Sequence, residues 1–213
     1  MTKETKRTLV LTTIVCLIPI IAGAVLYPRL PEQIVTHWAA DGTPNGWSSR
    51  FVGALVLPGI LLILNLLMPL LLKTDPKFKD MTEKTKSIVQ WIIPVTELFA
   101  SGTTLAYAVG AKVKIELLAP LFMGVLFIII GNYMPKMSRS YTVGIKLPWT
   151  LDDDDNWHRT HRLAGFVWVL CGILMIAAAF FPCRMVLFCI LLGLMTLVPV
   201  IYSYVLFLKK KKQ

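Results

Sequence analysis

Three side chains in the passage WTLDDDDNWHRTHRLAG, residues 149–165, have types and spacing that suit a metal ion. On a helix, Asp154, His158 and His161 stand at i, i+4 and i+7 and therefore share one face. Two imidazoles and a carboxylate can bind zinc or iron. No glutamate stands between the histidines, as it does in the metalloprotease motif H-E-x-x-H. A membrane-embedded metal-dependent hydrolase or peptidase is therefore one hypothesis, but enzyme activity and a zinc cofactor are not the favoured expectations.

The alternative interpretation of the same passage is the start of a helix in water. Thr150 and Asp153 have the spacing of a capping box, and acidic residues in a first turn favour the positive end of the helix dipole. Asp155 and Arg159 form an i, i+4 pair of the favourable polarity. We therefore expect a capped interfacial helix whose aspartates balance nearby cations.

Glu97 is a second residue that could carry chemistry, because it lies near the middle of an apolar block. A charged carboxylate at that depth costs at least about 2.5 kcal/mol, so it should face other helices, pair or take up a proton. Asn65 in a neighbouring block is a candidate partner. The two residues predict either polar contacts between helices or the ion site of a small transporter or channel.

His37 is followed by Trp38 and, a few residues later in the same loop, by turn residues such as Asp41-Gly42. Its imidazole could titrate near neutral pH or contact a ligand. The alternative interpretation is that His37 is a residue of the membrane surface held by turn hydrogen bonds, and it explains the histidine equally well.

Six long apolar blocks must position all these residues. The chain has 213 residues, of which 56% are hydrophobic and 16% charged, whereas a soluble domain would carry about 25% charged residues. About 20 apolar residues cross the hydrocarbon layer as a helix. The blocks at 9–27, 51–72, 88–110, 117–134, 163–182 and 185–208 therefore predict an all-α, polytopic membrane protein with six spans, in a single membrane domain covering 1–213.

The distribution of lysine and arginine predicts the orientation. The N-terminus, the loop after the second block, the loop from Lys136 to Arg162 and the C-terminal lysines together hold 17 of the 22 basic residues. The positive-inside rule places this richer set in the cytoplasm, together with both termini. Basic residues split among short segments beside a membrane fit anionic lipid and do not predict direct nucleic-acid binding.

Two connections are unusually rich in informative residues. Residues 28–50 should form an extracellular interfacial loop, with turns at Asp41-Gly42 and Pro44-Asn45-Gly46 and with aromatic rings at the headgroups. Residues 131–162 should form an irregular cytoplasmic loop followed by the interfacial helix. The basic cytoplasmic loop at 73–87 shows no site signal.

These two connections resemble a known family. LPEQIVTHWAADGTPNGW resembles the uncharacterised N-terminal domain usual in the SdpI family of bacterial toxin-immunity membrane proteins, through His37, Trp38, Gly42, Pro44 and Trp47. GNYMPKMSRSYTVGIKLPWTLDDDDNWHRTHRLAG resembles that family's C-terminal signature. The matching residues are Gly131, Asn132, Tyr133, Met134, Pro135, Lys136, Gly144, Pro148, Trp149, Thr150, Leu151, Trp157, Thr160, His161 and Arg162.

The resemblance implies a multi-pass protein of the bacterial cell membrane that protects its own cell against a secreted, membrane-active peptide toxin. It further implies that the outer loop meets the toxin and that the cytoplasmic side can sequester a repressor of the ArsR type. His158 is not part of the family pattern, so His161 is the better candidate for a functional histidine.

Overall fold

The computed structural model describes residues 2–77 and 81–211 and confirms a mostly helical architecture. Two residues of the charge count, Lys79 and Lys212, lie outside this range. The helices are α1 (Lys3–Leu26), α2 (Leu57–Thr74), α3 (Glu83–Ala108), α4 (Ile115–Tyr133), α5 (Pro148–Leu151), α6 (Asp154–Ala178) and α7 (Arg184–Lys211). The strands β1 (Gln33–Trp38) and β2 (Pro44–Ser49) form one antiparallel pair. Short turns of other helix types stand at Tyr27–Arg29, Val52–Val56 and Met134–Lys136.

Within the described residues, five helical segments are long and apolar enough to cross a membrane. They are Lys3–Arg29, Val52–Thr74, Ile115–Lys136, Asp154–Ala178 and Arg184–Lys211. The chain is therefore a polytopic helical membrane protein. The sixth predicted span corresponds to α3, which has 26 residues but more polar side chains.

Several polar residues in the middle of α3, among them Glu97 and Ser101, are buried against the protein, as expected for polar side chains in a membrane helix. Ser87 near the start of α3 lies 3.5 Å from Thr8 near the start of α1, and Glu97 in the middle of α3 interacts with Cys16 in the middle of α1. The two helices therefore run parallel over the same depth. This geometry favours a transmembrane α3, and the count of six spans stays a prediction.

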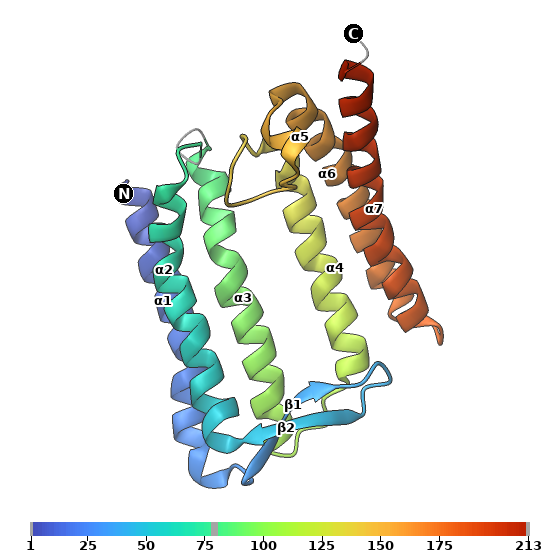
Figure 1. The fold of residues 1–213 in the computed structure, drawn as a ribbon. Coiled ribbons are helices and arrows are strands. Elements are labelled where there is room, and N and C mark those ends of the chain that lie inside the picture. The colour runs from blue at the N-terminus through green and yellow to red at the C-terminus, as the bar shows by residue number, and fades with distance from the viewer. Residues whose placement is uncertain (1, 78–80, 212–213) are drawn as a thin grey trace. The chain divides into compact units, whose positions relative to one another are not determined.

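The described chain forms two compact units. Unit 1 comprises residues 1–71 and 86–116, and unit 2 comprises residues 72–85 and 117–213. In unit 1, α1, α2 and α3 stand side by side (Figure 1). The β1–β2 hairpin covers the end of this bundle at which α1 ends and α2 begins (Figure 1). In unit 2, α4, α6 and α7 are neighbours, with α5 at one end (Figure 1).

Residues 28–50, which were predicted to form an interfacial loop with turns, contain the β1–β2 hairpin, whose strands were not predicted. Val35 pairs with Trp47 and His37 with Gly46, with an irregularity in the register on each side of His37. The turn is closed by the Gly42 amide, which donates to the Ala39 carbonyl at 2.9 Å. Gly42 adopts a φ of 87°, which a glycine reaches without steric cost.

Small residues let the hairpin and the start of α2 approach closely. A Cβ on Gly53 would lie 2.5 Å from the Ile34 side chain, and one on Gly23 of α1 would lie 2.4 Å from the Ala54 carbonyl oxygen. Gly53 and Ala54 belong to the π-helical turn Val52–Val56, which precedes α2. Ile34 therefore anchors the hairpin in a buried cluster completed by Leu30, Ala54 and Leu105.

In unit 2, the backbones of α4 and α6 approach each other closely at two pairs of glycines. A Cβ on Gly131 would lie 2.9 Å from the Gly165 carbonyl oxygen, and one on Gly124 would lie 2.7 Å from that of Gly172. Small residues at such crossings are typical of membrane helices. The predicted interfacial helix is not a separate element, because α6 begins at Asp154 and continues without a break through the apolar block.

Candidate functional site

His161 lies near the end of the segment 131–162, which we call the signature segment, and its ring contacts both Trp157 and Ile145 of that segment. Its side chain is fully buried. Its Nδ1 lies 2.8 Å from the Trp157 carbonyl oxygen, and its Nε2 accepts from the Ile145 amide at 3.0 Å. Since Nε2 is the acceptor, Nδ1 carries the proton and donates to Trp157. The ring therefore ties the irregular half of the signature segment to the first turns of α6.

This arrangement does not support the metal hypothesis. Both nitrogens of His161 are engaged, so the neutral ring has no lone pair left for a ligand bond. The carboxylate of Asp154 lies 3.0 Å from Arg139 Nε, and His158 is exposed. Among the described residues, no three His, Cys, Asp or Glu side chains gather closely enough to hold an ion. The predicted set shares a helix but is not brought together.

Gly144 is the position on which the histidine contact depends. Its φ is 114°, and a Cβ there would lie 2.7 Å from His161 Nε2 and 2.8 Å from the Trp157 ring. Trp157 is fully buried, stacks on His161 with ring centroids 4.0 Å apart, and donates from Nε1 to the Met137 carbonyl at 2.9 Å. Glycine is thus required both by the backbone conformation and by the space.

Thr150 has a different role from the predicted one. The N-cap of α6 is Asp153, whose side chain accepts from the Asp155 amide, so the capping box starting at Thr150 is wrong. Thr150 is buried in α5, where its hydroxyl donates to the Ile145 carbonyl at 2.8 Å. A hydrogen bond from Lys210 is the largest cause of the lowered pKa of Asp153, and the two side chains are 2.9 Å apart.

The most heavily bonded carboxylate of the site is one that the sequence did not indicate. Asp75 lies in the basic loop that showed no site signal, and it is 3% exposed. Its Oδ2 accepts from the Ser140 hydroxyl at 2.5 Å and from the amides of Tyr141 and Thr142 at 2.8 and 3.0 Å. Its Oδ1 accepts from the Lys77 amide at 3.0 Å. The carboxylate thereby fixes the signature segment to the segment 72–85 of the same unit.

The pKa of Asp75 follows from this environment. Burial alone would raise it, but the hydrogen bonds from Ser140, Lys77 and Thr142 outweigh burial and hold the pKa of Asp75 below its ordinary value. The charged form is therefore the form that the fold selects.

The signature segment is also joined to α7. The Asn156 side-chain amide donates to the Ser203 carbonyl at 2.9 Å, and the indole of Trp149 donates to the Ser203 hydroxyl at 3.0 Å. Thr160 donates to Asn156 at 3.0 Å and so orients its side chain. Neither Asn156 nor Ser203 was predicted as a site residue. Both are buried polar residues. The sequence does not show that the face of α6 with Asn156 packs against the face of α7 with Ser203.

The other family positions surround this core. Pro135 packs against Gly165 at the α4–α6 crossing, and the ammonium of Lys136 lies 4.7 Å above the Tyr133 ring. The predicted residues Asn132, Pro148 and Arg162 are exposed. They stand on the surface of the signature segment, where a partner could reach them.

The hairpin of unit 1 holds the second group of predicted residues. The Nδ1 atom of His37 lies 2.5 Å from the side-chain oxygen of Asn45, and Trp38 meets Tyr107 of α3 edge to face at 6.0 Å. A Cβ on Gly42 would lie 2.5 Å from the Glu116 carboxylate. His37 is thus held by a turn hydrogen bond, one of its two predicted interpretations.

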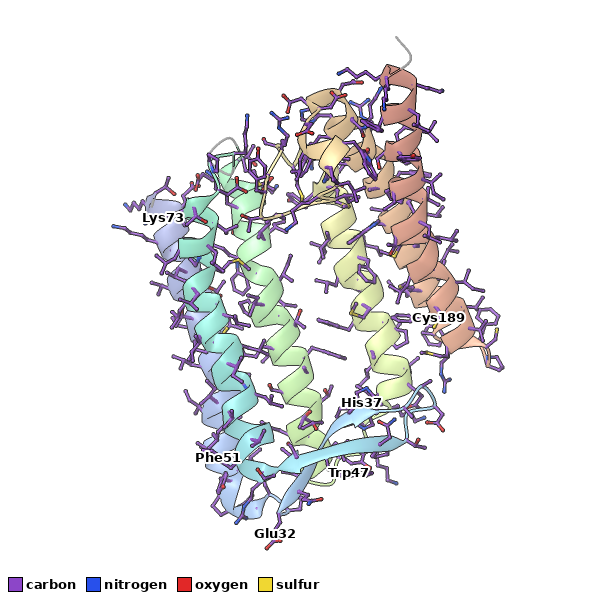
Figure 2. The ribbon with its side chains drawn as sticks, viewed as in Figure 1. Glu32, His37, Trp47, Phe51, Lys73 and Cys189 are labelled. Atoms are coloured by element: carbon purple, nitrogen blue, oxygen red, sulfur yellow. The ribbon has the colours of Figure 1, made fainter. Side chains whose placement is uncertain are left out.

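Exposed aromatic surface and a cavity lie beside the hairpin. Trp47 and Phe51 are each 55% exposed, and Figure 2 shows Trp47 and His37 on the hairpin at the end of the unit 1 bundle. A cavity of about 260 Å³ opens next to β1, with hydroxyls of Thr36, Ser101 and Thr104 in a mostly apolar wall.

Glu97 lies deeper in unit 1 and is fully buried. The proposed partner Asn65 donates instead to Thr13 of α1 at 3.4 Å, so the predicted Asn65–Glu97 pair is wrong. Neither carboxylate oxygen of Glu97 has a hydrogen-bond partner of ordinary geometry among the described residues. The thiol of Cys16 is the polar group that interacts with it.

Comparisons with known proteins match both regions. Residues 136–203 match the SdpI/YfhL protein family, and residues 14–62 match a domain of unknown function, DUF1648. A relative named Immunity protein SdpI, from Bacillus subtilis (strain 168), is 29% identical over 195 residues, which cover 91% of each chain. No solved structure matches the chain. The predicted resemblance and the multi-pass bacterial membrane location are confirmed.

Proposed function

Because the chain carries an SdpI/YfhL family segment behind a DUF1648 domain, we propose that it is a membrane immunity protein that protects a bacterium against a secreted peptide toxin. The observation that carries the proposal is the similarity to Immunity protein SdpI along 91% of both chains. This stretch is long enough to include both the hairpin and most of the signature segment.

The hairpin is the surface on which we expect the toxin to bind. Its aromatic residues lie beside the helix ends, where an amphipathic peptide would meet the membrane surface. Trp47 presents more than half of its surface and Trp38 is held by Tyr107. Exposed aromatic side chains on a fixed backbone are typical centres of binding energy in protein interfaces.

The signature segment is the surface on which we expect a cytoplasmic partner, a repressor of the ArsR type. Its buried contacts hold the backbone in one arrangement, and its exposed charges lie on the first turns of α6. These are Asp154, Asp155, Arg159 and Arg162. An ordered loop with both signs of charge gives orientation and specificity to an encounter with a soluble protein.

Survival of toxin-treated cells tests the proposal. The test applies the toxin against which SdpI gives immunity to Bacillus subtilis cells that lack SdpI. Cells that produce this chain in their membrane are expected to grow at a toxin dose that stops the growth of cells carrying an empty vector. If they stop at the same dose as the vector control, with the protein detected in the membrane fraction, the proposed function is wrong for that toxin.

The same assay locates the toxin surface. Trp47→Ala is expected to lower the tolerated dose at least about tenfold, because truncating a central aromatic contact costs more than about 1.4 kcal/mol of binding. Phe180→Ala is the matched control, since Phe180 is an aromatic residue of unit 2 that is 70% exposed. Equal tolerance in the two variants would argue against the hairpin as the binding surface.

A further inference from the structure

A stripe of buried polar residues runs along one face of α3 in unit 1. Gln90, Glu97, Ser101 and Thr104 are each at most 8% exposed. Their spacings of seven, four and three residues place them on the same side of a helix. An apolar face would satisfy the packing of a membrane helix, so a polar face turned inward needs another explanation.

Two members of this stripe lack a hydrogen-bond partner of ordinary geometry among the described residues. Both carboxylate oxygens of Glu97 and the side-chain oxygen of Gln90 are buried without a hydrogen bond among the described residues. Buried polar atoms are nearly always paired in folded proteins, so each exception requires a cause. No described Lys, Arg or His forms an ion pair with Glu97 either.

The groups around Glu97 are neutral. From α1 the titratable group against it is the thiol of Cys16, which is fully buried. The buried polar residue of α2 is Asn65, which carries no charge and is bonded to Thr13. A carboxylate in this setting has neither a counter-charge nor hydrogen-bond donors besides a weak thiol. A neutral carboxylic acid in the same place carries no charge that needs compensation, and only its O–H group requires a hydrogen-bond acceptor.

A route for that proton exists at one end of the stripe. Ser101 stands one helical turn from Glu97, and Ser101 and Thr104 also line the cavity beside β1. The cavity of about 260 Å³ is roomy enough for water. Water in the cavity can therefore approach the hydroxyl of Ser101, one turn from Glu97, and that of Thr104 one turn further on.

We propose that Glu97 is a proton-binding site inside unit 1, occupied by a proton at neutral pH and filled from the cavity through Ser101 and Thr104. The ligand is the proton alone. A metal cation would need several oxygen ligands, whereas Gln90, the next unpaired oxygen, is two helical turns away from Glu97. The site makes the neutral acid the form with which unit 1 packs.

Infrared spectroscopy of the full-length protein in vesicles of ether lipids, which carry no ester carbonyl, tests this proposal directly. A neutral carboxylic acid absorbs in a region of the spectrum that carboxylates and peptide groups leave free. At neutral pH the protein is expected to show this band, and Glu97→Gln is expected to lack it while keeping the amide bands of the folded protein. Asp154→Asn is the matched control, because the exposed Asp154 carboxylate should contribute nothing to the band.

Transfer to deuterated water tests the route. The band is expected to shift as the carboxyl proton exchanges for deuterium, and Ser101→Ala combined with Thr104→Val should slow the shift at least several-fold. A spectrum of the unaltered protein without the acid band at neutral pH would overturn the proton site, whether or not Glu97→Gln folds. If the band shifts as fast in the double variant as in the parent, the proposed route through Ser101 and Thr104 is wrong.

Discussion

Replacing His161 by alanine is expected to release the signature segment and to abolish protection. The change removes a fully buried ring, its stack on Trp157 and the acceptor of the Ile145 amide. A cavity and an unsatisfied donor together cost about 3 kcal/mol or more. Hydrogen exchange of the amides around Ile145 should therefore accelerate at least about 100-fold, and cells that make the variant should stop at the toxin dose of vector controls.

His158→Ala is the matched control for this prediction. His158 lies on the same helix three residues earlier but is exposed, so its loss should change stability by less than about 0.5 kcal/mol. The two variants separate a structural role from metal binding, since a site built on both histidines would lose function with either change. Normal exchange rates and normal protection in His161→Ala would contradict the account of the site.

Replacing Asp75 by asparagine is expected to have the second largest effect. Asparagine keeps the shape but brings its amide group toward donors that now bond to a carboxylate, among them Ser140 and Thr142. Each hydrogen bond to a charged group contributes about 1.5–3 kcal/mol. Exchange at residues 140–143 should therefore accelerate about 10- to 100-fold, while exchange in the middle of α6 stays unchanged.

The effect of Asp75 should also depend on pH. The folded protein holds the pKa of Asp75 below its ordinary value, so the unfolded chain binds the proton more tightly. The stabilisation is thus fully present above about pH 4, the pKa of an unfolded aspartate, and is lost as pH falls through the lower pKa of the folded form. The difference in Tm between the parent and Asp75→Asn should shrink on acidification.

Asp152→Asn is the control for both measurements, because it removes an exposed aspartate of the same unit. It should leave exchange at residues 140–143 and the dependence of Tm on pH as they are in the parent. A Tm difference between the parent and Asp75→Asn that stays constant down to strongly acidic pH would argue against the charged, bonded form of Asp75.

The helices could be predicted from the sequence because burial in lipid demands long apolar blocks, and Glu97 was identified because it interrupts one. The hairpin was missed although its turn residues were recognised. Its strands are short, and the chain from Pro44 to Ser49 shows weak apolar alternation, so neither strand carries a clear period. The start of α6 was misplaced by three residues because Thr150 and Asp153 are both residue types that favour N-caps.

The residues of the site were easier to predict from the sequence than the contacts between them. His161 was found through the family pattern, but its two hydrogen bonds depend on the left-handed backbone at Gly144. Asp75 and Ser140 are 65 residues apart, and the sequence does not encode in any local pattern that they meet. The Asn65–Glu97 pair was wrong for a related reason, since the rotation of a helix against its neighbours is set by packing.

The proposed function requires that the hairpin face the outside of the cell and the signature segment the cytoplasm. Cysteine labelling of intact cells tests this requirement most directly. Ala40→Cys in the hairpin turn and Asp152→Cys in the signature segment replace exposed residues, each in a protein whose exposed Cys183 and Cys189 are changed to serine. A thiol reagent that cannot cross membranes should modify the first variant in intact cells and the second only after the cells are made permeable. Modification of both variants from the same side would contradict the account.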